Sequence, residues 1–171
     1  MMKFETWIGL VLLLLCGCTQ SPKTKLSLPH IDQFETIPDG LDLQAGAPQF
    51  KLVAFLSGDC YECITDLNKW QHFNDSIGVS DKVALRFYIY SYDFDRFKTL
   101  IQSHEDLQIP LLLDVNNIIY NEYLIPLGLE NDKVAYLLNE TNEVVVKGYP
   151  FYDRDILDQY VSALSEAKLL E

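Results

Sequence analysis

The chain has 171 residues, of which 49% are hydrophobic and 22% are charged, a composition typical of one globular domain and not of a disordered chain. Its formal net charge of -12 leaves no basic stripe that could displace counterions from phosphates, which argues against a nucleic-acid partner. An acidic surface is expected mainly to favour solubility.

The N-terminus carries a hydrophobic leader that is separate from this domain. The apolar run from Trp7 to Leu15 is too short to span a bilayer comfortably and has the shape of a signal h-region. It ends in Leu-Cys-Gly-Cys at 15–18, which resembles the lipobox of bacterial lipoproteins. The resemblance implies cleavage after residue 17 and acylation of Cys18. A cleaved secretory signal and an uncleaved anchor are the alternatives. Lipid would hold the protein at a membrane surface without a spanning helix, since each buried CH₂ contributes about 0.8 kcal/mol.

Three segments are therefore expected: a lipoprotein signal peptide over 1–17, a tether and lead-in over 18–48, and the folded domain over 49–171. The tether is rich in proline and polar residues and carries a turn signal at Asp39-Gly40. Its apolar residues are expected to dock on the domain, as an edge hairpin: Phe34, Ile37, Leu41 and Leu43.

The central motif is the stretch 50–66, which reads Phe-Lys-Leu-Val-Ala-Phe-Leu-Ser-Gly-Asp-Cys-Tyr-Glu-Cys-Ile-Thr-Asp. Its apolar first half predicts a strand, the break at 57–59 predicts a turn, and Cys60 and Cys63 fall where a helix begins. The first N–H groups of a helix lack internal partners and carry partial positive charge, which favours a thiolate. Cys60 is therefore the predicted nucleophile, and Cys63 is placed to close or resolve a disulfide with it.

The rest of the chain alternates between helix and strand patterns. In order, it predicts a helix over 60–77, a strand over 83–90, a helix over 94–104 and a strand over 110–114. A helix capped by Asn116 or Asn117 follows, through about Tyr123, and Pro126 and Gly128 mark a loop. The chain ends with a hairpin of strands over 134–139 and 144–148 and a helix from about Asp153. Strands separated by helices imply parallel crossovers, and a closing hairpin adds antiparallel strands. The order β-α-β-α-β-α-β-β-α predicts an α/β fold of the thioredoxin-like kind, a mixed sheet flanked by helices.

Several motifs resemble the membrane-tethered thiol-disulfide oxidoreductases of the TlpA and ResA kind, within the thioredoxin superfamily. They are the strand, turn and Cys-Tyr-Glu-Cys of 55–63, the strand of 110–114 with Tyr123 following, and the hairpin of 135–145. The resemblance covers about 50–164 and implies a redox-active dithiol at Cys60 and Cys63. The residues expected to surround it are Asp59, Tyr61, Glu62, Asp66 and Lys133.

Two positions depart from the family pattern. Asp59 stands where the family usually has Trp just before the first Cys. Lys133 stands where the family has a cis-proline beside the dithiol, and a cis bond without proline costs about 2.5–4 kcal/mol, so a trans peptide is expected. Because the cis-proline loop normally offers backbone groups to the incoming chain, substrate docking is the property that this departure affects.

Other uses of the two cysteines remain open at this point. A zinc site would need two more ligands, and the three histidines of the chain are scattered singly. Haem attachment requires a His directly after the second Cys, where Ile64 stands. A structural disulfide in a non-enzymatic binding module is the main alternative to redox chemistry. A peroxidase is a weaker one, since Ser57 replaces the threonine that peroxiredoxins hold three residues before their cysteine.

Charge near the pair indicates a direction of electron flow. Asp59, Glu62 and Asp66 bring negative charge close to the thiols, and no Lys or Arg lies between Lys51 and Lys69. Nearby carboxylates oppose thiolate formation, which predicts a poor oxidant that reduces other disulfides.

The expected protein is thus a bacterial envelope lipoprotein that reduces protein disulfides. Cys16 would leave with the signal and Cys18 would carry lipid, so that only Cys60 and Cys63 remain as a redox pair. Outside the cytosol disulfides persist, and the dithiol needs an upstream reductant protein to recharge it. The dithiol carries the electrons itself, so that neither a metal nor another cofactor is expected.

Overall fold

The structure is a computed structural model, which describes residues 24–38, 48–77, 82–102, 104, 107–129 and 133–168. The expected signal peptide, the lipidated Cys18 and the apolar Leu41 and Leu43 lie outside these residues.

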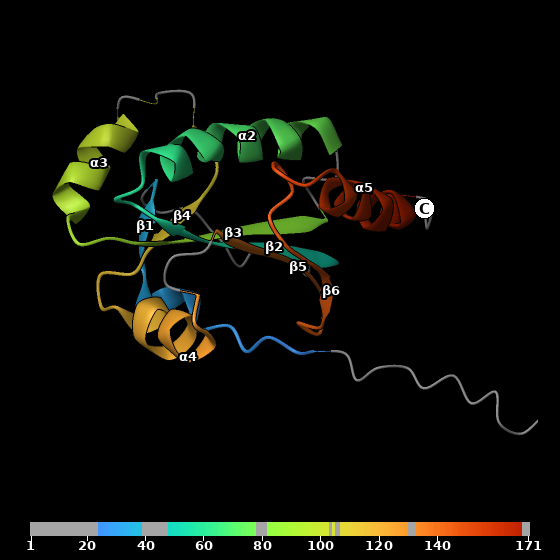
Figure 1. Cartoon of the computed structure of the whole chain (residues 1–171), viewed down its shortest axis with the longest axis horizontal. Helices are drawn as coiled ribbons and strands as arrows, with labels where there is room; N and C mark the ends of the chain where they lie inside the picture. Colours follow the sequence, from blue (N-terminus) through green and yellow to red (C-terminus); the bar gives the residue numbers. More distant parts are fainter. Residues whose placement is uncertain are drawn as a thin grey trace, which may run out of the picture.

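A six-stranded mixed sheet forms the centre of the molecule, with the strand order β1-β4-β3-β2-β5-β6 (Figure 1). The strands are β1 (Glu35–Ile37), β2 (Phe50–Ser57), β3 (Val83–Tyr90), β4 (Leu111–Leu113), β5 (Val134–Asn139) and β6 (Val144–Lys147). Strands β2, β3 and β4 are parallel, whereas β1, β5 and β6 each pair antiparallel with their neighbour. Parallel strands need crossover helices, which explains why α2 (Tyr61–Ile77) follows β2 and α3 (Phe94–Gln102) follows β3.

Helices cover both faces of this sheet (Figure 1). They are α2 (Tyr61–Ile77), α3 (Phe94–Gln102), the π-helix η3 (Tyr120–Leu124), the single turn α4 (Ile125–Leu127) and α5 (Arg154–Lys168), with a 3-10 turn η2 (Ile31–Gln33) before β1. In Figure 1, α2, α3 and α5 lie on one face and α4 lies on the other. Within the described part of the chain, no helix is long and apolar enough to cross a membrane.

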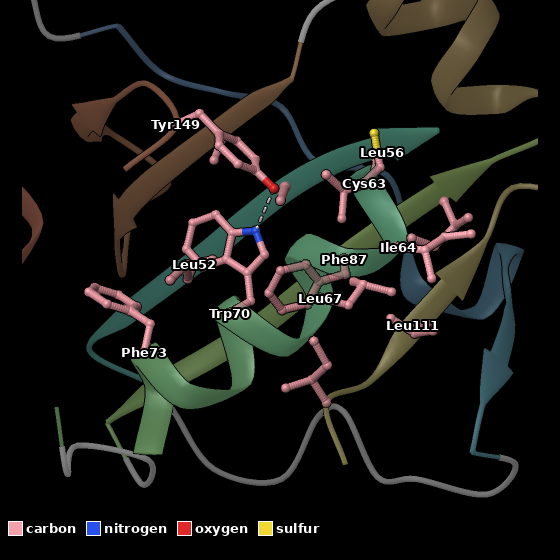
Figure 2. Close-up of a cluster of buried hydrophobic side chains, with 14 of the residues drawn as sticks. Leu52, Leu56, Cys63, Ile64, Leu67, Trp70, Phe73, Phe87, Leu111 and Tyr149 are labelled. Carbon is pink, nitrogen blue, oxygen red and sulfur yellow. Dashed lines mark hydrogen bonds between the residues drawn. The ribbon is translucent and has the colours of Figure 1, made fainter. Parts of the chain in front are cut away.

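Two hydrophobic clusters fix these layers. The larger lies between the sheet and α2 and α5, and its centre is Trp70, 1% exposed, whose indole N–H donates to the Tyr149 hydroxyl at 3.1 Å (Figure 2). The second cluster covers the opposite face of the sheet and includes Phe34 of the lead-in. The centre of the Phe34 ring lies 5.0 Å from the centre of the Tyr88 ring, in an edge-to-face arrangement. Because the central strands are buried on both faces, they read in sequence as continuous apolar runs.

The predicted elements from Phe50 onward are present in the predicted order. The lead-in docks through Phe34 and β1, which takes the edge position beside β4; the rest of the expected hairpin lies outside the described residues. The third crossover differs in detail, because the buried carboxylate of Asp114, rather than Asn116 or Asn117, accepts the N–H groups of Ile118 and Tyr120. Pro126, predicted to mark a loop, lies inside α4, and Gly128 ends that helix with φ 65°.

Candidate redox site

The dithiol follows the carboxyl end of the central strand β2. A sharp turn at Gly58 delivers the chain from Ser57 to the start of α2, and the Gly58 N–H donates to the carbonyl of Tyr90 at 2.8 Å. A Cβ on Gly58 would lie 2.9 Å from the Phe97 ring and 3.1 Å from the Ser91 Cβ. The turn therefore packs directly against the end of β3 and the side of α3, where only glycine fits without displacement.

Cys60 lies immediately before the first residue of α2. Its carbonyl accepts the N–H groups of Cys63 at 3.0 Å and Ile64 at 3.2 Å, and its Sγ also accepts the Cys63 N–H at 3.2 Å. The sulfur thus occupies the place that a Ser or Asp oxygen takes in a capped helix, facing donors that the helix leaves unpaired. Cys60 is half-buried, and the Tyr61 side chain beside it is 80% exposed, so that solvent reaches this end of the helix.

Cys63 lies behind Cys60, 5% exposed and packed in the larger hydrophobic cluster (Figure 2). The two cysteines are thiols and are not joined to each other. Burial raises the pKa of Cys63 to about 12, and the neighbouring Cys60 adds to this rise. The positive charge of Lys133 and a backbone hydrogen bond from Ser57 act in the opposite direction.

Lys133, the residue immediately before β5, reaches the same helix. Its ammonium donates to Asp66 at 2.9 Å, to the Tyr152 hydroxyl at 3.2 Å and to Glu62 at 3.3 Å. It also lies 4.7 Å from the centre of the Tyr152 ring and 5.8 Å from that of Tyr149, within range of cation–π attraction. The position where the family pattern has proline is here the centre of an ionic cluster.

Asp66 is the buried anchor of this cluster, 1% exposed although it is charged. Lys69 donates to its Oδ1 at 2.7 Å, and the Tyr152 hydroxyl lies 3.0 Å from both of its oxygens. Burial by itself raises the pKa of Asp66, but the hydrogen bonds from Lys69, Lys133 and Tyr152 outweigh it and hold the pKa below its ordinary value. Burial lowers the pKa of Lys133, but its hydrogen bonds to Asp66, Tyr152 and Glu62 outweigh this and raise that pKa above its ordinary value. Carboxylate and ammonium therefore both carry charge at neutral pH.

The structure changes the charge balance that the sequence indicated. Of the three acids near the thiols, Asp66 and Glu62 are ion-paired with Lys133, which is 67 residues from Asp66 in sequence. Asp59 accepts the Ser91 hydroxyl at 2.8 Å and the Tyr92 N–H at 2.9 Å, which fastens the turn to the end of β3. Lys133, which is distant in sequence from these acids, thus offsets part of the negative charge near Cys63.

The five predicted neighbours fall into two groups. Glu62, Asp66 and Lys133 are joined by direct contacts, whereas Asp59 contacts the other side of the turn and Tyr61 projects into solvent. Sequence reasoning missed the rest of the cluster: Lys69, Tyr149 and Tyr152. The spacing of three residues between Asp66 and Lys69 on one helix was the only local signal of it.

A cleft beside the turn was also missed. It measures about 350 Å³ and is lined by Tyr90, Ser91, Tyr92, Asn117, Tyr120 and Asn121. These residues follow the carboxyl ends of β3 and β4, which meet that of β2 at one edge of the sheet. Burial raises the pKa of Tyr90 to about 12.

Among the described residues, no three His, Cys, Asp or Glu side chains gather where they could hold a metal ion.

Comparison with known proteins identifies the fold. No protein-family model matches the chain, and no curated protein matches its sequence. Among solved structures, the exposed lipoprotein thioredoxin Etrx1 from Streptococcus pneumoniae matches with a TM-score of 0.53 at 14% identity, over 71% of this chain and 89% of that one. A thiol-disulfide oxidoreductase from Bacteroides fragilis matches with a TM-score of 0.53 at 14% identity, over 68% and 81%.

A third structure agrees with these two. A secreted disulfide oxidoreductase from Mycobacterium tuberculosis matches with a TM-score of 0.50 at 14% identity, over 67% of this chain and 81% of that one. At these identities the likeness concerns the fold, and it confirms the predicted thioredoxin-like arrangement. Of these three structures, two are described as disulfide oxidoreductases and one as a thioredoxin.

Proposed function

We propose that the chain is an extracytoplasmic thiol-disulfide oxidoreductase that reduces protein disulfides through Cys60 and Cys63. The observation that carries this proposal is the position of Cys60. This residue is half-buried at the N-terminus of α2, where its sulfur accepts the Cys63 N–H at 3.2 Å. Donors of this kind stabilise a thiolate more than a thiol. The second thiol is held one helical turn behind, where it can attack in turn.

The reaction consists of two exchanges. The Cys60 thiolate attacks one sulfur of a substrate disulfide, which forms a mixed disulfide and releases the other sulfur as a thiolate that takes up a proton. The Cys63 sulfur then loses its proton and attacks Cys60, which forms the Cys60–Cys63 disulfide and releases the second substrate thiol. One disulfide is reduced and one dithiol is oxidised, so that a separate reductant protein must return the pair to its starting state. No cofactor takes part.

The acids around the dithiol support the reducing direction. A strongly oxidising pair owes its potential to a reduced form in which a thiolate is favourable. Asp59, Glu62 and Asp66 place negative charge near the two thiols, and carboxylates oppose the formation of a thiolate. The pair should therefore give up its electrons readily.

The expected location is the bacterial cell envelope, with the protein facing away from the cytoplasm and held by lipid on Cys18. The leader sequence supports this, and the neighbours in fold include a protein described as an exposed lipoprotein and one described as secreted. The expected partners are a protein disulfide, an upstream reductant protein and the membrane surface.

The test uses the full-length protein in detergent. Wild type, Cys60→Ser and Cys63→Ser are equilibrated against glutathione and then assayed for reduction of a protein disulfide. Wild type should turn over, Cys60→Ser should be inert, and Cys63→Ser should accumulate a mixed disulfide with the substrate. Equal inertness of all three proteins would contradict the proposal.

A binding module without redox chemistry is the second candidate, and one observation favours it. The side chain of Lys133 lies where the related family has a proline that receives substrate, and it is bound to Asp66 and Glu62. In such a module the two cysteines would serve only as a static link. Inert cysteine variants that still bind the partner of the wild type would support this reading.

A further inference from the structure

The resolving step requires Cys63 to become a thiolate, and the surroundings of Cys63 disfavour this charge. To attack the mixed disulfide, Cys63 must become a thiolate, yet it is 5% exposed and packed among apolar side chains. Burial and the adjacent Cys60 raise its pKa to about 12. The proposed reaction therefore needs a nearby group that favours the Cys63 anion.

Lys133 lies beside Cys63, because its ammonium donates to Glu62 and Asp66, which stand one residue before and three residues after Cys63 on α2. Its positive charge favours the Cys63 anion. It cannot relax into water, because Asp66, Tyr152 and Glu62 hold it at 2.9 to 3.3 Å and its side chain is only 23% exposed. A charge held in a partly dry site acts on its neighbour more strongly than a mobile one in solvent.

Asp66 holds Lys133 in place and does not act as a proton acceptor in the resolving step. Its pKa lies below the ordinary value of 3.8, so that it remains ionised and binds a proton weakly at neutral pH. Its two oxygens instead fix Lys133 on one side and Lys69 on the other. The Tyr152 hydroxyl, 3.0 Å from both oxygens, completes the clamp from the loop before α5.

We propose that Lys133, clamped by Asp66 and Tyr152, is a positioning residue that stabilises the Cys63 thiolate and so speeds the resolution of the mixed disulfide. The inference rests on the proposed redox function. In the resolving step the Cys63 proton passes to water or to the departing substrate sulfur, while Lys133 keeps its own proton. The titratable groups around this step are Cys60, which precedes α2, together with Glu62, Asp66 and Lys69 of α2, Tyr90 of β3, and Tyr149 and Tyr152 before α5.

The test separates the two exchanges with an aromatic disulfide that releases a coloured thiolate. Reduced full-length protein in detergent should release one coloured thiolate as Cys60 attacks and a second as Cys63 resolves. Lys133→Met should slow the second phase about tenfold at neutral pH, since the loss of a nearby opposite charge shifts a pKa by about one unit or more. It should change the rate of the first phase less than about twofold. The pH at which the second phase reaches half of its maximal rate should shift to a higher value.

Lys51→Met is the matched control, because it removes an ammonium that is hydrogen-bonded to Glu140 and Asn142 at the other end of β2 from the dithiol. It should leave both phases within about twofold of wild type. Lys133→Arg keeps the charge and should restore most of the second-phase rate. Tyr152→Phe keeps the ring but removes the hydroxyl of the clamp, and should slow only the second phase, by about two- to threefold. This variant keeps the test valid if Lys133→Met does not fold.

The possible outcomes distinguish this inference from the proposed function. If wild type reduces a protein disulfide but Lys133→Met leaves the second phase unchanged, or slows both phases equally, only the role of Lys133 is overturned. Equal slowing by Lys51→Met would overturn it too, because the effect would then not depend on a charge near Cys63. If wild type shows no second phase and reduces no protein disulfide, the proposed function fails and the inference fails with it.

Discussion

Replacing Asp66 with Asn tests whether the buried carboxylate holds α2, β5 and the loop before α5 together. Asn keeps the shape of the side chain but loses the charge and one acceptor. The carboxylate receives three donors, from Lys69 at 2.7 Å, Lys133 at 2.9 Å and Tyr152 at 3.0 Å. The Asp66 side chain is 1% exposed, and its ion pair with Lys133 joins two segments that are 67 residues apart in sequence.

The magnitude follows from the exposure of each donor. The Lys69 side chain is 44% exposed, so its contact contributes less than about 1 kcal/mol after screening by solvent. Hydrogen bonds to a charged group contribute about 1.5–3 kcal/mol, which applies to Tyr152 and, in part, to Lys133. Removing one partner of a buried pair costs about 3–5 kcal/mol. Because Asn still accepts one hydrogen bond, the expected loss of unfolding free energy is about 2–3 kcal/mol.

Urea denaturation, followed by far-ultraviolet circular dichroism, measures this loss as a function of pH. Since the folded-state pKa of Asp66 is depressed, its contribution is fully present above the ordinary value of 3.8 and is lost as the pH falls through the folded-state pKa. The wild type and Asp66→Asn should therefore differ at neutral pH and converge in acid, down to the lowest pH at which both remain folded. A difference that stays constant over this range would refute the reasoning, because the charge would then contribute nothing.

Three further predictions concern the dithiol turn and the core. Gly58→Ala should cost about 1–3 kcal/mol of unfolding free energy by chemical denaturation, since its Cβ would meet Phe97 at 2.9 Å; no loss would show that α3 yields easily. Trp70→Phe should cost about 2 kcal/mol in the same assay, because it removes indole volume and the 3.1 Å bond to Tyr149. Iodoacetamide at neutral pH should modify Cys60 well before Cys63, as peptide mapping would show, because Cys63 is buried with a pKa of about 12; equal labelling would contradict this.

The elements around the dithiol could be predicted because their signals are local. The apolar run of β2, the glycine at 58 and the helical spacing after Cys60 each act within a few residues, so that the strand, the turn and the helix follow from the sequence alone. The alternation of such segments restricts the fold to a mixed sheet with parallel crossovers, which the structure confirms.

Details that depend on buried polar groups were harder to predict. The sequence favoured Asn116 or Asn117 as the cap of the third crossover, because both side chains are common at helix starts. The structure uses Asp114, the residue directly after β4, since its carboxylate is buried and must find donors close by. Burial, which a sequence window does not report, decided between neighbouring candidates.

The sequence by itself determined where the two sulfurs lie, because a helix start is a local event and both cysteines belong to it. Only the tertiary structure decided which charges surround them. The sequence places Asp66 near the dithiol as an acid that opposes a thiolate, but it does not show that the chain brings Lys133 and Tyr152 to it from 67 and 86 residues away. Such contacts form when β5 pairs with β2 and α5 packs on α2, and the energetic need to pair a buried carboxylate then selects the partners within reach.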